Sequence, residues 1–152
     1  MIKFLKAKLE NISSMQKLVS PEIESGVILE RSDDEIATNI RSYTLVFNDN
    51  ELIAFCALHV HSPFLGEIRS LIVKEDARGK SVGKNLVLKL LDEGKELGLQ
   101  KVLSLTYEKS FFQRLDFVEI PKESLPEHKI WADCIKCKHF PICNEVSLIK
   151  NL

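Results

Sequence analysis

The sequence predicts an α/β fold in which one mixed sheet of about seven strands is flanked by helices. Short strand-like apolar runs alternate with longer segments of helical period along the 152 residues. Between residues 67 and 97, an apolar strand leads through a loop of glycine and basic residues directly into an amphipathic helix. Such a strand–loop–helix unit is typical of folds that bind anions at a helix N-terminus.

Apolar runs of strand length, most of them bounded by turn residues, are predicted to form the sheet. In chain order they cover residues 1–8, 43–47, 52–59, 67–73, 101–106, 117–120 and 146–149. A hairpin signal at residues 48–51 joins the second and third of these strands.

Helical periodicity is predicted over four segments, which cover residues 11–19, 32–40, 82–97 and 110–115. Pro21 is expected to end the first helix, since a proline inside a helix removes a backbone donor. Ser32 and Glu35 have the spacing of a capping box at the start of the second.

The composition limits the class of protein. A chain of this length suits one domain with its own core, expected to cover residues 1–152. Its 21 basic and 22 acidic residues nearly cancel, so no broad surface for nucleic acid or membrane is expected. The apolar runs are far shorter than a membrane span, and the N-terminus has the pattern of a strand instead of a signal peptide. We therefore expect a cytoplasmic protein.

The loop before helix 82–97 has the composition of a phosphate-binding site. The first N–H groups of a helix have no partner inside it, and the helix dipole adds positive potential. Gly79 and Gly83 let the backbone approach a phosphate, and Arg78, Lys80 and Lys84 supply charge. The spacing fits neither a Walker P-loop nor a Gly-x-Gly-x-x-Gly dinucleotide fingerprint, so we predict a pyrophosphate site of another kind.

The segment Arg78-Gly-Lys-Ser-Val-Gly83 resembles the Q/R-x-x-G-x-G/A motif with which the GNAT N-acetyltransferases hold the pyrophosphate of acetyl-CoA. The order of predicted elements is also similar to theirs over the whole chain. The resemblance implies the GNAT fold, whose sheet is splayed between its fourth and fifth strands, with acetyl-CoA as co-substrate. Ser81 departs from the motif, because it stands where the family has its first glycine and serine tolerates a positive φ poorly.

The resemblance also implies which residues bind the cofactor. Backbone groups at the end of strand 67–73, the residues of the loop and the start of the helix would hold it. These residues are Leu71, Ile72, Val73, Arg78, Gly79, Lys80, Ser81, Val82, Gly83, Lys84 and, further along the chain, Phe112.

Two residues are implied in catalysis. Glu67 falls on the general base of the histone acetyltransferases of this family, and a carboxylate there would take the proton of an attacking amine. The alternative for Glu67 is a solvated residue at a strand start. Phe112 stands where the family often has a tyrosine acid, so Tyr107 is the remaining candidate acid. Tyr107 has the alternative of packing at the strand end, and a thiolate also leaves without an acid.

A narrower resemblance concerns the acceptor. Several segments are similar to the short N-acetylglutamate synthases, which acetylate the α-amine of L-glutamate at the start of arginine biosynthesis. Arg31, Arg41 and Arg69 lie in these segments, and guanidinium groups are the natural partners of the two glutamate carboxylates. Strand period puts Arg69 on one face with Glu67 and Leu71. The alternative for each arginine is a surface ion pair.

The segment 129–145 holds a Trp-x-Asp-Cys-x-x-Cys-x₅-Cys pattern, which is also similar to these synthases. Its Cys-x-x-Cys knuckle is a zinc signal, and the potential ligands are Cys134, Cys137, His139 and Cys143. The second half of the segment lacks a matching pair, so we expect no metal and instead a compact loop of reduced thiols.

Three functions therefore compete. The first is N-acetylglutamate synthase, favoured by the cysteine segment and the arginines. The second is a GNAT enzyme for another small amine or a protein amine. The third is a CoA-binding module without catalysis, suggested by Ser81 and by the missing tyrosine. The expected partner is a small molecule, L-glutamate first, and the sequence leaves a homodimer open.

Overall fold

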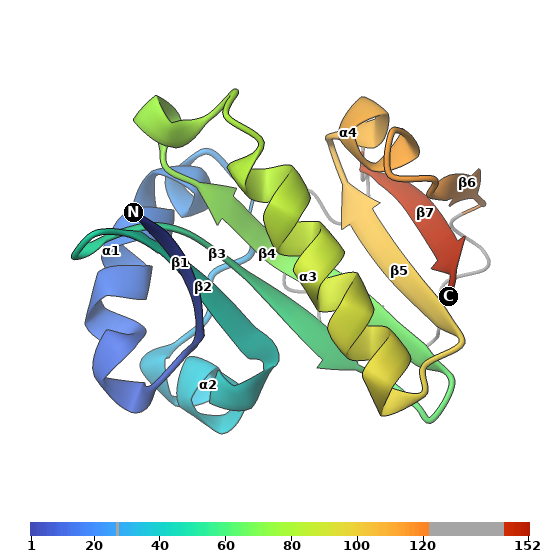
Figure 1. Ribbon diagram of the computed structural model, residues 1–152, viewed down its shortest axis with the longest axis horizontal. Coiled ribbons are helices and arrows are strands. Elements are labelled where there is room, and N and C mark those ends of the chain that lie inside the picture. Colours follow the sequence, from blue (N-terminus) through green and yellow to red (C-terminus); the bar gives the residue numbers. More distant parts are fainter. Residues whose placement is uncertain (27, 122–144) are drawn as a thin grey trace.

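The computed structural model describes residues 1–26, 28–121 and 145–152, and these build one seven-stranded sheet of order β1-β2-β3-β4-β5-β7-β6 (Figure 1). Its strands are β1 (Ile2–Lys6), β2 (Tyr43–Asn48), β3 (Glu51–Val60), β4 (Leu65–Val73), β5 (Lys101–Thr106), β6 (Val118–Ile120) and β7 (Val146–Asn151). β4 and β5 are parallel, and the other neighbours are antiparallel. The predicted mixed sheet of about seven strands is confirmed.

Helices cover both faces of this sheet. They are α1 (Ile12–Glu24), α2 (Asp33–Thr38), α3 (Val82–Leu97) and α4 (Lys109–Gln113), with 3-10 turns η1 (Leu9–Asn11), η2 (Ile40–Ser42) and η3 (Glu75–Ala77). Figure 1 shows α3 crossing the face of β3 and β4 that is turned to the viewer. Leu86 and Leu90 of α3 are buried in the core on that face. Met15 of α1 and Ile36 of α2 are buried in a second core, on the opposite face.

Local signals position α2, α3 and β5. Ser32 Oγ accepts a hydrogen bond from the Glu35 N–H at 3.1 Å, and Glu35 Oε1 accepts one from the Ser32 N–H at 3.3 Å. The predicted capping box is therefore confirmed, although α2 ends at Thr38 and a 3-10 turn continues the chain. The bounds of α3 and β5 are those that the sequence predicts, residues 82–97 and 101–106.

The predicted end of the first helix at Pro21 is wrong, because α1 continues to Glu24 with Pro21 inside it. An interior proline removes one helical hydrogen bond and costs about 3 kcal/mol. Met15 and Val19, before the proline, are buried against the sheet, and Ile23, after it, packs on the same core. Burial of this face on both sides of the proline holds the helix together, since tertiary packing overrides local propensity.

The sheet opens between its fourth and fifth strands. β4 and β5 pair from Leu65↔Lys101 to Ile68↔Ser104, although both strands continue beyond that point. The strands after this register position therefore diverge, which is the splay that the GNAT resemblance implies.

A β-bulge changes the direction of β4 at the start of this opening. Ser70 and Leu71 together face the single residue Cys56 of β3, and Ser70 adopts a left-handed φ of 58°. The predicted common face for Glu67, Arg69 and Leu71 is wrong for Leu71. The extra residue reverses the alternation of side chains, so Leu71 packs against the core under α3.

Two buried side chains hold the bulge. The Cys56 thiol donates to the Arg69 carbonyl oxygen at 3.4 Å. Burial raises the pKa of Cys56 far above its usual range, so the sulfur keeps the proton that it donates. Tyr43 of β2 is hydrogen-bonded to the Ser70 side chain. The bulge is thus fixed by β2 and β3 together.

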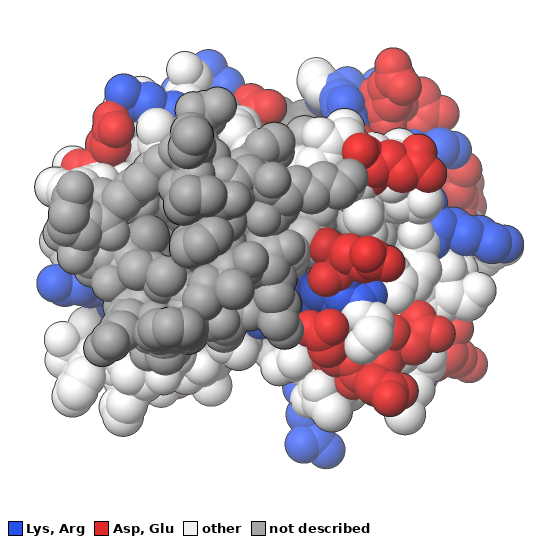
Figure 2. All heavy atoms as spheres, turned by 180° about the vertical axis from the view of Figure 1, so that it is seen from behind, with Lys and Arg blue, Asp and Glu red and all other residues white. Residues whose placement is uncertain are grey.

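Figure 2 shows the face opposite to that of Figure 1. On the part not drawn in grey, Lys and Arg side chains are interspersed with Asp and Glu side chains. Among the described residues, none of the helices has the length and the apolar character needed to cross a membrane.

The strained serine at the start of α3 gives a stability prediction. Ser81 has φ 64° and ψ 14°, and the left-handed region costs a non-glycine residue about 1–2 kcal/mol. Glycine removes that cost, but it has more conformational freedom in the unfolded chain, and losing this freedom on folding costs about 0.5–1 kcal/mol. We therefore expect Ser81→Gly to raise the free energy of unfolding, measured in urea, by up to about 1 kcal/mol.

Ser14→Gly is the matched control, because Ser14 is an exposed residue inside α1. There glycine has only its entropic cost, and we expect a loss of about 0.5 kcal/mol. Equal losses in the two variants would contradict the assigned conformation of Ser81.

Candidate functional site

A cavity of about 1150 Å³ occupies the opening between β4 and β5. This exceeds the range of about 300–1000 Å³ that is usual for small-molecule sites. Its walls are the β4 residues from Glu67 to Val73, the end of β5, part of α4, the loop before α3, the end of α1 and the segment before α2. A site of this size accommodates two reactants side by side.

The loop before α3 forms one end of the cavity. The first helical hydrogen bond runs from the Asn85 N–H to the Ser81 carbonyl oxygen at 3.0 Å. The N–H groups that precede it in α3 thus have no acceptor within the helix. Gly79 with φ 78° and Ser81 with φ 64° give the loop the left-handed conformations that a tight anion cradle needs. Ser81 thus adopts the left-handed conformation, which is disfavoured for residues that carry a Cβ.

The basic residues of this loop differ in position. Arg78 and Lys84 line the cavity, whereas Lys80 is exposed and is not part of its wall. Arg78 Nε donates to the Val73 carbonyl oxygen at 2.9 Å, and Arg78 Nη2 donates to Glu22 Oε1 of α1 at 3.1 Å. These bonds orient the guanidinium at the end of β4, beside the cradle.

Gly83 brings the start of α3 close to β4. A Cβ at this position would lie 3.4 Å from Val73 Cγ2 and 3.7 Å from the Phe111 ring. Val82, one residue earlier, is buried in the core. The cradle is therefore pressed against the strand end where Leu71, Ile72 and Val73 also line the cavity.

Glu67 lies at the cavity wall and is 1 % exposed. Its Oε1 is 2.7 Å from Nε2 of His61 and 3.9 Å from Nη1 of Arg69. An ionised carboxylate buried in this way needs such partners, because removing a charge from water is costly. The alternative interpretation of Glu67 as a solvated residue at a strand start is wrong, because the side chain is buried.

The structure brings two of the three predicted arginines to the cavity. Arg31 and Arg69 line it, and each side chain is 13 % exposed. The Arg31 backbone is held by Gln16, whose Nε2 donates to the Arg31 carbonyl oxygen at 2.9 Å. Burial raises the pKa of Tyr43, and the positive charges of Arg31 and Arg69 oppose this rise.

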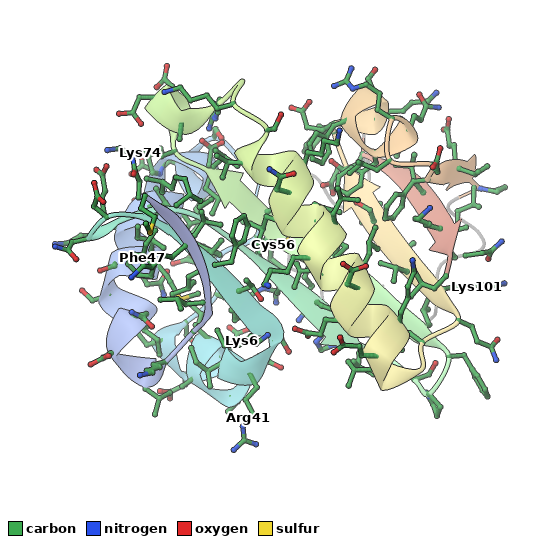
Figure 3. The ribbon with its side chains drawn as sticks, viewed as in Figure 1. Lys6, Arg41, Phe47, Cys56, Lys74 and Lys101 are labelled. Atoms are coloured by element: carbon green, nitrogen blue, oxygen red, sulfur yellow. The ribbon has the colours of Figure 1, made fainter. Side chains whose placement is uncertain are left out.

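Arg41 is not brought to the cavity. It belongs to η2 and is exposed, and Figure 3 shows its side chain pointing away from the body of the fold.

The wall on the β5 side is mainly aromatic. Phe112 is buried and lines the cavity, with its ring edge-on to those of Phe111 and Phe117 at centroid distances of 5.0 and 5.1 Å. Tyr107 follows β5, lines the cavity and is 37 % exposed. A phenol at this wall is a candidate proton donor, whereas Phe112 offers packing alone.

The four potential zinc ligands, Cys134, Cys137, His139 and Cys143, and the compact loop of reduced thiols that we expect there instead, lie outside the described residues. Within residues 1–26, 28–121 and 145–152, no group of three or more His, Cys, Asp or Glu side chains is arranged to hold a metal ion.

Sequence reasoning missed the partner of Glu67 and the bulge beside it. His61 precedes Glu67 by six residues across the β3–β4 turn, and His59 is the register partner of Glu67. If the two predicted strands had been paired as a hairpin, the pairing would have placed these histidines near the carboxylate of Glu67. Ser70 carries no such signal, because residues 71–73 are all apolar, and the sequence therefore does not show where the alternation reverses.

Comparison with known proteins bears on this site. The model of the acetyltransferase (GNAT) family matches residues 9–117. An uncharacterized N-acetyltransferase of Chlorobaculum tepidum is 34 % identical over 146 residues, which cover 96 % of this chain and 94 % of that protein. An amino-acid acetyltransferase of Pectobacterium carotovorum is 31 % identical over 129 residues, which cover 82 % of this chain but only 29 % of the relative.

Solved structures share the fold. The N-acetylglutamate synthase of Neisseria gonorrhoeae, complexed with coenzyme A and N-acetyl-glutamate, matches with a TM-score of 0.88 at 22 % identity, over 100 % of this chain and 35 % of that one. A Mycobacterium tuberculosis protein in complex with CoA matches with a TM-score of 0.81 at 21 % identity, over 99 % of both chains. At these identities the structures bear on the fold alone. Because the family model covers most of the chain and a relative above 30 % identity covers nearly all of it, this protein belongs to the acetyltransferase (GNAT) family.

Proposed function

We propose that the protein transfers the acetyl group of acetyl-CoA to the α-amine of L-glutamate, the first step of arginine biosynthesis. One observation carries this proposal. A single cavity has a phosphate cradle at one end and joins it to the buried carboxylate of Glu67 and to two arginines, Arg31 and Arg69. Family membership supports acetyl transfer, and the arginines support an acceptor with two carboxylates.

Acetyl-CoA fits the part of the cavity between the cradle and the β-bulge. Its pyrophosphate would accept hydrogen bonds from the first N–H groups of α3, with Arg78 and Lys84 adding charge. The pantetheine would run along the end of β4, where pairing with β5 has stopped. A backbone N–H between Leu71 and Val73 would then polarise the thioester carbonyl, which is stabilisation of the oxyanion type.

The acceptor amine must be neutral when it attacks. In the proposed reaction the ammonium group first gives one proton to Glu67, directly or through a water, and the neutral nitrogen forms a bond to the thioester carbon. The nitrogen then releases its second proton to solvent as the carbon–sulfur bond breaks, and the departing thiolate takes a proton from Tyr107 or from solvent. The products are N-acetylglutamate and free CoA.

The two arginines would hold the acceptor. Guanidinium groups bind carboxylates through paired N–H donors, and Arg31 and Arg69 offer one group for each carboxylate of glutamate. Arg69 also lies beside Glu67, with 3.9 Å between Arg69 Nη1 and Glu67 Oε1. A carboxylate bound there would leave its α-amine close to the base.

Relatives give the acceptor further support. The Pectobacterium relative is named an amino-acid acetyltransferase, and the Neisseria structure holds N-acetyl-glutamate. This chain spans 29 % and 35 % of those two proteins, so their whole-protein activities come to it only as part of this proposal.

An assay of CoA release from acetyl-CoA with a panel of amines tests the function. We expect turnover with L-glutamate, weaker turnover with L-glutamine, which lacks one carboxylate, and little with lysine or polyamines. Glu67→Gln should lower kcat by about 10²–10⁴-fold with little change in the affinity for CoA, because only the proton acceptor is lost. Turnover with lysine or a polyamine but none with glutamate would refute the acceptor. CoA binding without turnover of any amine would indicate a non-catalytic module.

The arginines are tested by paired substitutions to lysine. Arg31→Lys keeps the charge but loses the planar pair of donors, so we expect KM for glutamate to rise about tenfold or more with a smaller change in kcat. Arg41→Lys is the matched control on the exposed surface, and its kinetics should equal those of the unsubstituted protein. A similar KM in both variants, measured by steady-state kinetics, would remove Arg31 from the acceptor site.

A further inference from the structure

We propose that His61 is a positioning residue for Glu67, keeping its carboxylate ionised and fixed in orientation while it acts as the base. His61 Nε2 lies 2.7 Å from Glu67 Oε1, and the two side chains are 3 % and 2 % exposed. An ionised carboxylate can only accept hydrogen bonds, so Nε2 must carry the hydrogen and donate it. The pair is a short hydrogen bond between two buried groups on either side of the β3–β4 turn.

The β3–β4 turn fixes the His61 backbone. The His61 N–H donates to the Leu65 carbonyl oxygen at 2.9 Å, which closes the turn directly after β3. Ser62 Oγ accepts from the N–H groups of Phe64 and Leu65 at 3.2 and 3.1 Å. A turn of this kind leaves the histidine little freedom, so its ring is presented to Glu67 from a rigid support.

A second histidine steadies the ring. His59 and His61 are in edge-on contact, with ring centroids 4.7 Å apart and an interplanar angle of 76°. His59 is also the register partner of Glu67 across the β3–β4 ladder. The carboxylate, its donor and the ring against that donor thus come from one hairpin.

The electrostatic consequence follows from burial. Burial favours the protonated form of a carboxyl group, whereas a donor bonded to the charged form favours ionisation. His61 therefore opposes the effect of burial on Glu67, and Arg69 does the same from 3.9 Å. Other described charged or titratable groups along this cavity are Glu22, Glu30, Arg31, Glu35, Arg78, Lys84, Tyr107, Glu108, Arg114 and Glu145. The hydrogen bond between His61 and Glu67, at 2.7 Å, is shorter than the 3.9 Å that separates Arg69 Nη1 from Glu67 Oε1.

This inference rests on the proposed role of Glu67 as the base and holds for any amine that the protein acetylates. We expect His61→Leu, which keeps a side chain of similar bulk but has no donor, to move the acidic limb of the pH profile of kcat upward by about one to two pH units. At pH values below the shifted limb, kcat should fall about tenfold or more and recover as the pH rises. KM for acetyl-CoA should stay within about twofold.

His61→Gln restores a donor through its amide and should recover most of the activity that His61→Leu loses. Ser62→Ala is the structural control, since it removes two hydrogen bonds of the same turn without touching the imidazole. Its pH profile should keep its shape. In a Glu67→Gln background, His61→Leu should have less than about a twofold effect, because the two residues act as one unit. Equal losses at every pH, or additive losses in the double variant, would overturn the proposal.

A measurement without substrate separates this inference from the proposed function. The ¹³C resonance of the Glu67 side-chain carboxyl, assigned by its loss in Glu67→Gln, reports the pKa of that group directly. A higher pKa in His61→Leu than in the unsubstituted protein supports the positioning role even if glutamate is not the acceptor. An unchanged pKa overturns it even if glutamate is turned over.

Discussion

The short parallel ladder between β4 and β5 is the constraint on which the rest of the structure depends. Pairing covers only Leu65–Ile68 of β4, and the cavity begins where it ends. An intact ladder would fill this space with backbone hydrogen bonds and leave no opening in the sheet. Beyond Ile68, β4 is no longer paired with β5. The N–H and C=O groups on this edge of β4 can therefore bind a ligand.

The β-bulge turns this opening into a chemically asymmetric site. Before the bulge, Glu67 and Arg69 are near each other at the cavity wall. After it, Leu71 packs into the core under α3, which anchors the end of β4 against the helix that carries the cradle. One inserted residue therefore separates a polar side of the cavity, the proposed acceptor side, from a backbone-lined side, the proposed cofactor side. The bonds from Cys56 and Tyr43 hold the inserted residue in place.

The sequence predicted what depends on local pattern. Helix α3 and strand β5 follow from hydrophobic period, and the cradle follows from glycine and charge at a helix start. The end of α1 was mispredicted because Pro21 is outweighed by burial of Met15 and Ile23 on either side of it. The bulge could not be foreseen, since a one-residue slip in register is decided by packing on both faces of the sheet.

Site residues show the same division between local and non-local information. The cradle is one continuous segment, so its residues were found together. The proposed acceptor side is assembled from β4, the β3–β4 turn and the segment before α2, and only three-dimensional proximity joins them. Sequence alone could not tell that Arg41 is exposed while Arg31 lines the cavity, because the two arginines lie close to the two ends of the same short helix, α2.

The charges around Glu67 also bear on its proposed role as the base. Without an acceptor, Arg69 and the donor on His61 would both favour the ionised form of the Glu67 carboxylate. A carboxylate stabilised in this way has a lower affinity for a proton. A bound dicarboxylate would pair with Arg31 and Arg69 and neutralise much of their charge. The field that weakens Glu67 would then fall at the moment when the amine is next to it. His61 would keep the carboxylate ionised through this change, because its bond does not depend on the arginines. In the proposed reaction, acceptor binding and base strength are thus coupled through the same guanidinium groups.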